Sequence, residues 1–94
     1  MSDKILQQAI ATWGETAQMD MVQEECAELI TAIAHYKRGR IAEYDLIDEC
    51  ADAIIMTRQL RLILGVDEVD ERITQKLDRL QIRMEIAAKG EDGK

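Results

Sequence analysis

The stretch that decides the fold is QEECAE, residues 23–28, where three glutamates stand inside an otherwise apolar run. A second stretch, DECADA at 48–53, repeats the pattern. Each places a cysteine after a carboxylate and a second carboxylate three positions after the first: Glu25 and Glu28 in one, Glu49 and Asp52 in the other. Residues three apart lie about 60° apart around an α-helix and about 4.5 Å apart along it. Each stretch therefore predicts a helix bearing two neighbouring carboxylates.

Apolar residues at helical spacing surround both stretches and predict an all-α fold. Proline is absent and glycines are few, which favours the same class. Asp45 and Asp67 are expected to cap the third and fourth helices. We expect one four-helix domain over residues 1–94 with a frayed tail from about 88. The predicted helices cover about 4–13, 16–36, 44–64 and 67–87, with turns at Gly14, 37–40 and Gly65.

The third predicted helix carries more apolar side chains than one buried face holds. Cys50 and Ile54 are expected on the core face of the third helix, which is apolar around almost its whole circumference. A chain of 94 residues cannot bury such a helix alone, so we expect dimerisation to complete the bundle, in a homodimer or homotetramer. Ile55, Leu62 and Ile63 are candidates for the interface. The expected buried stripe of the second helix is Met19, Val22, Cys26, Leu29, Ile30 and Ile33.

Folding the chain back at Gly39 is expected to bring the two carboxylate pairs together. Glu28 lies 11 residues before Gly39 and Glu49 lies 10 after it. Glu25 lies 14 before it and Asp52 lies 13 after it. In two antiparallel helices, equal distances from the turn give equal heights. The four carboxylates should therefore meet at one level, beside the core.

Four carboxylates in such a place need protons or a cation, because repulsion and desolvation oppose their ionisation. Ligands that are all oxygen favour Mg²⁺, with Mn²⁺ as the alternative. A ferritin-like di-iron site would need a Glu-x-x-His pattern, which the single histidine, His35, does not supply. For Glu24 the helical wheel points outward, and an ordinary solvated side chain is the simpler interpretation.

Charge and hydropathy exclude several classes of protein. The net charge of −7 argues against binding the nucleic-acid backbone. No apolar run is long enough to span a bilayer, and the N-terminus lacks the apolar segment of a signal peptide. The two cysteines without a secretory signal favour reduced thiols. We expect a cytoplasmic protein that binds neither nucleic acid nor membrane.

The sequence also resembles the MazG-like nucleoside triphosphate pyrophosphohydrolases, an all-α family. The family pattern E-E-x-x-E followed by E-x-x-D is present as Glu24, Glu25, Glu28, Glu49 and Asp52. Three longer stretches are similar to the family's lead-in, third helix and last helix, and together they cover most of the chain. They are WGETAQMDMVQEECAEL, ECADAIIMTRQLRLILG and ITQKLDRLQIRM.

The resemblance implies a MazG-like four-helix bundle and a Mg²⁺-dependent enzyme. Such an enzyme cleaves a nucleoside or deoxynucleoside triphosphate to the monophosphate and pyrophosphate, in house-cleaning or control of nucleotide pools. Glu24 takes the first position of the family pattern and joins the other four acidic residues as a candidate catalytic residue. The implied metal ligands are Glu25, Glu28, Glu49 and Asp52.

Candidate substrate contacts lie outside the acidic motif. Lys76 and Arg79 belong to a basic stripe of the fourth helix and match a lysine and an arginine of the family's last helix. They could bind phosphate, or pair with neighbouring carboxylates on the surface. Trp13 could stack on a base, although a lone tryptophan is more often a core anchor. Gln18 could form hydrogen bonds with a base edge.

Two alternatives remain open. Phosphoribosyl-ATP pyrophosphohydrolase shares the acidic motif, but its lead-in usually carries a glycine before the paired glutamates, and here the stretch is MVQEE. A non-catalytic helical dimer that binds or regulates a partner is the other alternative, and the intact set of four carboxylates argues against it.

Overall fold

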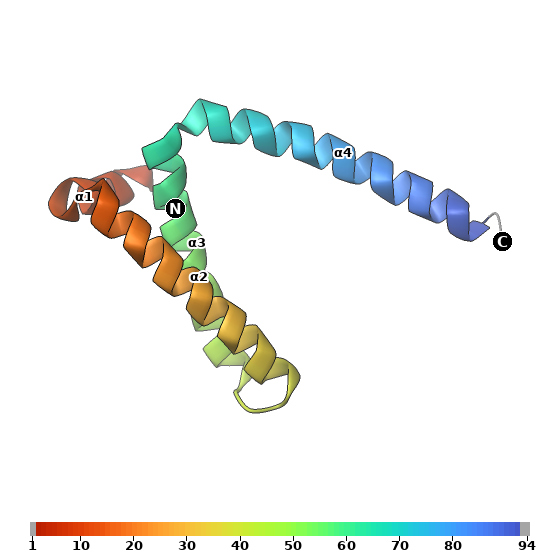
Figure 1. Ribbon diagram of the computed structural model, residues 1–94, viewed down its shortest axis with the longest axis horizontal. Helices are drawn as coiled ribbons and strands as arrows, with labels where there is room; N and C mark the ends of the chain where they lie inside the picture. The colour runs from red at the N-terminus through yellow and green to blue at the C-terminus, as the bar shows by residue number, and fades with distance from the viewer. Residues whose placement is uncertain (1, 93–94) are drawn as a thin grey trace. The chain divides into compact units, whose positions relative to one another are not determined.

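Four α-helices account for all the regular secondary structure in residues 2–92, the part of the chain that the computed structural model describes (Figure 1). This confirms the predicted all-α class. None of these helices combines the length and the hydropathy needed to cross a bilayer. The helices are α1 (Asp3–Trp13), α2 (Glu15–Lys37), α3 (Glu43–Leu64) and α4 (Val66–Asp92).

The chain divides into two units, Met1–Ile63 and Leu64–Lys94. The first unit holds α1, α2 and all of α3 but its last residue, and the second is built from α4. Both candidate carboxylate pairs belong to the first unit, whereas the basic stripe belongs to the second.

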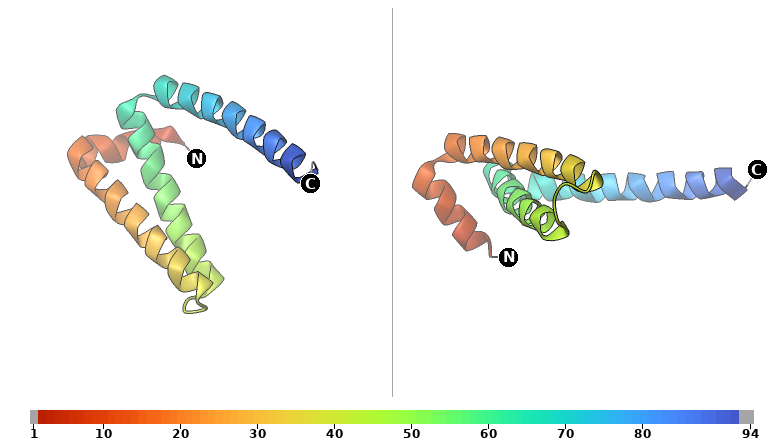
Figure 2. Two further views of the ribbon diagram at one scale, coloured as in Figure 1. Left: turned by 45° about the vertical axis from the view of Figure 1, so that its right-hand side comes forward. Right: turned by 90° about the horizontal axis from the view of Figure 1, so that it is seen from below.

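A tight turn joins α2 to α3, which run antiparallel and side by side (Figure 2). Gly39 has a φ of 71°, in the left-handed region that glycine adopts without strain. The backbone N–H groups of Gly39 and Arg40 donate to the carbonyl oxygens of Tyr36 and His35. The predicted turn at 37–40 is confirmed, and it sets the relative heights of the residues on α2 and α3.

The starts of α3 and α4 differ from the prediction. Asp45 lies in the first turn of α3 and not at its N-cap, and its Oδ2 accepts a hydrogen bond from the N–H of Ala42 at 3.0 Å. In a capping box, the side chain at position N3 accepts a hydrogen bond from the backbone N–H of the N-cap residue in the same way. Asp67 likewise lies in the first turn of α4, where its charge complements the helix dipole. Helix α4 then continues to Asp92, through most of the segment predicted to fray.

An ion-pair cluster ties α1 to α3. Asp3 lies 3.6 Å from Arg58 and 3.7 Å from Arg61, measured between carboxylate oxygen and guanidinium nitrogen. Leu6, one turn further along α1, is buried. Gly14 separates α1 from α2 with a φ of 91°, so the chain reverses abruptly between them. The end of α1 that carries Trp13 is thereby held close to the start of α2.

The core of the first unit is thin and includes polar groups. Gln18 of α2 and Gln59 of α3 are buried, and the Nε2 of Gln18 donates to the Oε1 of Gln59 at 2.5 Å. This pairing offsets the cost of removing two amides from water. The buried apolar side chains are Leu6, Val22, Ala32, Ala53 and Met56.

Only part of the stripe predicted for α2 turns inward. Val22 is buried, but Ile30 is 70% exposed, and Met19 and Ile33 are also exposed. The residues that turn inward are 18, 22, 25, 29 and 32, which follow a regular three-and-four spacing. The prediction joined residues of two apolar faces of α2 into one stripe. Glu25 therefore lies on the inward face of α2, where it is half-buried.

The same correction applies to α3. Cys50 is exposed and Ile54 is 47% exposed, so neither belongs to the core of the chain by itself. The buried residues are Ala53, Met56 and Gln59, and Glu49 is half-buried one turn before them. Cys26 of α2 is half-buried. The prediction that Cys50 is a small buried side chain is therefore wrong.

Helix α4 carries an uncovered apolar stripe. Ile73, Leu77, Leu80 and Met84 are each between 46% and 58% exposed. They recur at helical spacing, on one side of the helix. A stripe of this length is typical of a helix that packs against another helical surface.

Candidate functional site

Three carboxylates from two helices meet between α2 and α3. Glu25 projects from α2, and Glu49 and Asp52 project from α3. One carboxylate oxygen of each lies within 4.8 Å of the other two. Glu25 and Glu49 are half-buried on the inward faces, and Asp52 is exposed. Three of the four residues expected to meet are thus brought together, because the turn at Gly39 places them at the same height.

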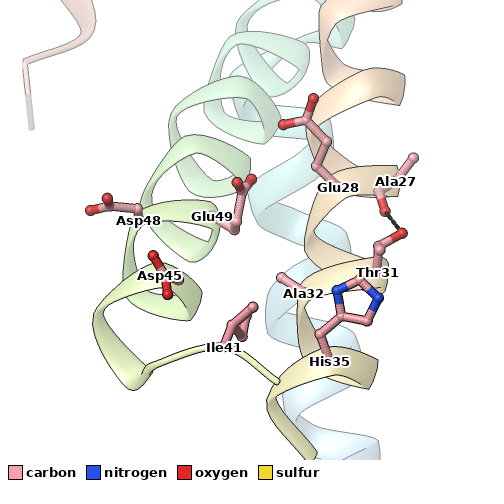
Figure 3. A pocket seen from close by; sticks show the side chains of 9 residues that line it. All are labelled: Ala27, Glu28, Thr31, Ala32, His35, Ile41, Asp45, Asp48 and Glu49. Atoms are coloured by element: carbon pink, nitrogen blue, oxygen red, sulfur yellow. Dashed lines mark hydrogen bonds between the residues drawn. The ribbon is translucent and has the colours of Figure 1, made fainter. Parts of the chain in front are cut away.

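Glu28, the fourth predicted residue, stands beside this cluster. It is exposed on α2, and in Figure 3 its carboxylate and that of Glu49 lie opposite each other across the gap between the helices. Its negative charge acts on both Glu25 and Glu49. Glu24 is exposed and takes no part in the cluster, in agreement with the helical wheel.

The surroundings raise the pKa of Glu25 and of Glu49 above their ordinary value of 4.5. Partial desolvation by the protein is the largest cause for both pKa values. The negative charges of Glu28 and then Asp52 follow, and a side-chain hydrogen bond with Glu28 adds to them. Like charges and desolvation thus both disfavour ionisation, so a bound cation would lower the free energy of the ionised cluster.

Two oxygens of the cluster are buried without a hydrogen-bond donor. These are the Oε2 atoms of Glu25 and Glu49, and no N–H or O–H group in residues 2–92 donates to them. A hydrogen bond between either carboxyl and Glu28 requires a proton on one of the two groups. At neutral pH a hard dication would satisfy these oxygens, and a set of only carboxylate oxygens suits Mg²⁺ or Mn²⁺. The residues present therefore fit the metal that the sequence predicts.

A groove of about 560 Å³ adjoins the cluster. Glu28 and Glu49 line its end toward the cluster, and His35 lies nearer the turn (Figure 3). The groove is acidic, so it favours cations, or anions that arrive with cations bound. The remaining lining residues are Ala27, Thr31, Ala32, Ile41, Asp45 and Asp48.

A second, more apolar pocket of about 520 Å³ lies where α1, α2 and α3 come together. Trp13 lines it and is 66% exposed, so its ring is not the core anchor that a lone tryptophan usually is. Gln18, 5% exposed, lines the same pocket. The structure thus brings together the two residues predicted to contact a base. The other lining residues are Ala9, Ala17, Asp20, Met21, Met56 and Gln59.

Gln59 was missed by the sequence analysis, although the signal was present. Gln18 lies seven residues before Glu25, and Gln59 lies seven residues after Asp52. The height argument that pairs the carboxylates also pairs these two amides, two helical turns further from the turn at Gly39. The presence of Gln59 within the apolar run of α3 is the sequence feature that indicates this pairing.

The predicted phosphate contacts lie on α4. Lys76 and Arg79, with Leu80 and Arg83, line a shallow hollow of about 300 Å³. Neither Lys76 nor Arg79 forms an ion pair with a carboxylate among the described residues, so the surface pairing considered from sequence is not observed. Both cations are available to bind an anion.

No protein-family model, no curated protein and no solved structure matches this chain.

Proposed function

We propose that this protein is a Mg²⁺-dependent nucleotide pyrophosphohydrolase, which cleaves a nucleoside or deoxynucleoside triphosphate to the monophosphate and pyrophosphate. The observation that carries the proposal is the convergence of Glu25, Glu49 and Asp52, with two buried oxygens that lack a donor. Without a bound dication, ionising these carboxylates costs free energy, because they repel one another and are partly desolvated. A bound dication would offset this cost.

In this proposal Glu25, Glu28, Glu49 and Asp52 hold the metal. These residues would hold a Mg²⁺ ion, which would supply Lewis-acid chemistry at the site by acidifying water and offsetting negative charge on phosphate. The half-buried position of Glu25 and Glu49 fixes their side chains and limits access of bulk water, which strengthens electrostatic interactions at the site. Glu24, exposed beside the cluster, could orient water from outside the metal's ligand set.

The other parts of a nucleotide are assigned to the remaining features. Lys76 and Arg79 are proposed to bind the distal phosphates, because both are cationic and free of carboxylate partners. Trp13 and Gln18 are proposed to contact the base in the apolar pocket, where the exposed indole offers a stacking surface.

The active form is proposed to be a homodimer or homotetramer in which α4 and the outer faces of α2 and α3 are covered in a MazG-like bundle. The exposed apolar side chains support this. Met19, Ile30 and Ile33 on α2, and Ile54 and Ile55 on α3, leave a second apolar face on each central helix. Together with the stripe of α4, this is more apolar surface than scattered exposed residues would give.

The decisive experiment is an assay of pyrophosphate release from a panel of ribo- and deoxyribonucleoside triphosphates, with phosphoribosyl-ATP included. The proposal expects release that requires Mg²⁺, stops with EDTA and disappears in Glu49→Gln. Preference for phosphoribosyl-ATP would instead favour that narrower activity. Binding of nucleotides without any release would favour a non-catalytic module and overturn the proposed reaction.

A further inference from the structure

The buried amide pair Gln18–Gln59 has a direction, and the direction bears on which bases the pocket accepts. The Nε2 of Gln59 donates to the Sδ of Met56 at 3.6 Å, one turn back on the same helix. Its Oε1 accepts the hydrogen bond from Gln18 Nε2 at 2.5 Å. Gln59 is thus engaged at both ends of its amide and is only 3% exposed.

This arrangement commits one N–H of the Gln18 Nε2 to Gln59 and leaves the Gln18 Oε1 as an acceptor for a ligand. No residue in 2–92 donates a hydrogen bond to Gln18 Oε1. Gln18 lines the apolar pocket, and Asp20, whose carboxylate is also an acceptor, lines the same pocket. Two acceptor groups, Gln18 Oε1 and the Asp20 carboxylate, therefore belong to the residues by which α2 lines the pocket.

We propose that Gln59 is a positioning residue that holds the Gln18 amide with its oxygen toward the pocket, and that the pocket thereby selects bases bearing an exocyclic amino group, which are cytosine, adenine and guanine, over uracil and thymine. The amino group is a donor that projects clear of the ring and can reach Gln18 Oε1. The imide N–H of uracil or thymine is flanked by two carbonyl oxygens, which Gln18 Oε1 and Asp20 repel. When an analogue without the amino group binds, Gln18 Oε1 is buried without a donor, and this disfavours its binding.

The inference rests on the proposed nucleotide substrate, but binding can test it without catalysis. The chain has a single tryptophan, so the indole N–H of Trp13 gives one NMR signal that reports on the pocket. Deoxycytidine is titrated against 2-pyrimidinone deoxyriboside, and deoxyadenosine against purine deoxyriboside, with deoxyuridine as a third probe. Each analogue lacks only the amino group of its parent.

In the wild-type protein the better amino-bearing nucleoside should bind about tenfold more tightly than its analogue. Gln59→Leu should bring that ratio close to one, because the freed Gln18 amide can turn either face to the pocket. Gln59→Glu, measured above neutral pH, should keep the ratio, because a carboxylate accepts the same hydrogen bond from Gln18 Nε2. The far-UV circular dichroism of both variants verifies that they fold.

The inference is overturned if Gln59→Leu keeps the wild-type ratio, if the wild-type protein does not distinguish parent from analogue, or if deoxyuridine binds best. Discrimination by a protein that releases no pyrophosphate would remove the proposed reaction and leave the inference standing. Release of pyrophosphate by a protein that does not distinguish parent from analogue would overturn the inference and leave the proposed reaction standing.

Discussion

Glu25 and Glu49 occupy inward positions that two packed helices normally fill with apolar side chains. Each carries a buried oxygen without a donor, and each has a raised pKa. Asp52 and Glu28 are exposed and flank them. The free-energy cost of ionisation thus falls mostly on the two half-buried residues. The exposed pair adds negative charge beside them. We therefore expect substitutions of the half-buried residues and of the exposed residues to have different effects on stability and on function.

Replacement of Glu28 should affect function far more than folding. Glu28→Gln removes one proposed ligand from the exposed side of the cluster, so Mg²⁺ affinity and pyrophosphate release should fall by about a hundredfold or more. Thermal stability without metal should stay the same or rise, because one of four crowded charges is gone. Glu43→Gln, an exposed glutamate in the first turn of α3, is the matched control. Equal activity of Glu28→Gln and the wild type would refute the metal assignment.

The pH dependence of stability follows from the raised pKa values of Glu25 and Glu49. Between 4.5 and these raised values the folded chain binds more protons than the unfolded chain, so metal-free stability should fall as pH rises through that window. The loss should be complete above the raised pKa values, and Mg²⁺ should restore stability there. Melting curves in EDTA and in Mg²⁺ at a series of pH values measure this. Glu49→Gln should flatten the EDTA profile more than Glu43→Gln does.

For the helices, the number of residues from Gly39 correctly predicted the height of side chains along the helix axis. It did not predict which apolar face of each helix turns inward. The distances from Gly39 correctly placed Glu25, Glu49 and Asp52 at one height, because an antiparallel helix pair leaves little freedom along its axis. Rotation about the axis was misjudged, since α2 and α3 each have two apolar faces and sequence alone does not rank them. Cys50 was assigned to the core for that reason. Trp13 was placed in the pocket by the geometry of α1, which depends on the Asp3 ion pairs and not on local spacing.

Gly65 is the backbone position on which the break between α3 and α4 depends. Its φ is 124°, and an added Cβ would meet the carboxylate of Glu68. The Glu68 carboxylate ends a flexible side chain and can move aside, so the cost comes from the positive φ: Gly65→Ala should destabilise the chain by about 1 kcal/mol or more. Gly90→Ala, in the helical part of α4 with open space around it, should stabilise by about 0.5–1 kcal/mol. Urea unfolding followed by circular dichroism compares the two, and an equal response would contradict this role for Gly65.

For the molecule as a whole, the exposed apolar faces of α2, α3 and α4 are the strongest sign of assembly. Sedimentation at micromolar concentration should give a mass that is a multiple of 10.7 kDa. Ile54→Lys and Ile55→Lys should shift the protein toward the monomer, because each places a charge on the outer face of α3. Ile5→Lys, at a 64% exposed position of α1, is the matched control. A wild-type monomer at that concentration would contradict the proposed assembly.

The position of bond cleavage tests the roles that the proposed function gives to the acidic cluster and the basic stripe. The cluster belongs to the first unit and the stripe to α4, and the proposal assigns them different parts of one triphosphate. If the metal ligands act at the α- and β-phosphates and Lys76 and Arg79 bind the distal ones, pyrophosphate is the leaving group.

Two measurements follow from this division of roles. Lys76→Ala should lose activity on triphosphates while Mg²⁺ affinity is kept, whereas Glu49→Gln should lose both. Lys89→Ala, an exposed cation near the end of α4, is the control for charge alone. Hydrolysis by the wild type in ¹⁸O-labelled water should place the label in the nucleoside monophosphate, because water then attacks the α-phosphorus. Label in pyrophosphate would move the attack to the β-phosphorus, and release of orthophosphate with a nucleoside diphosphate would refute the reaction even if the metal site holds.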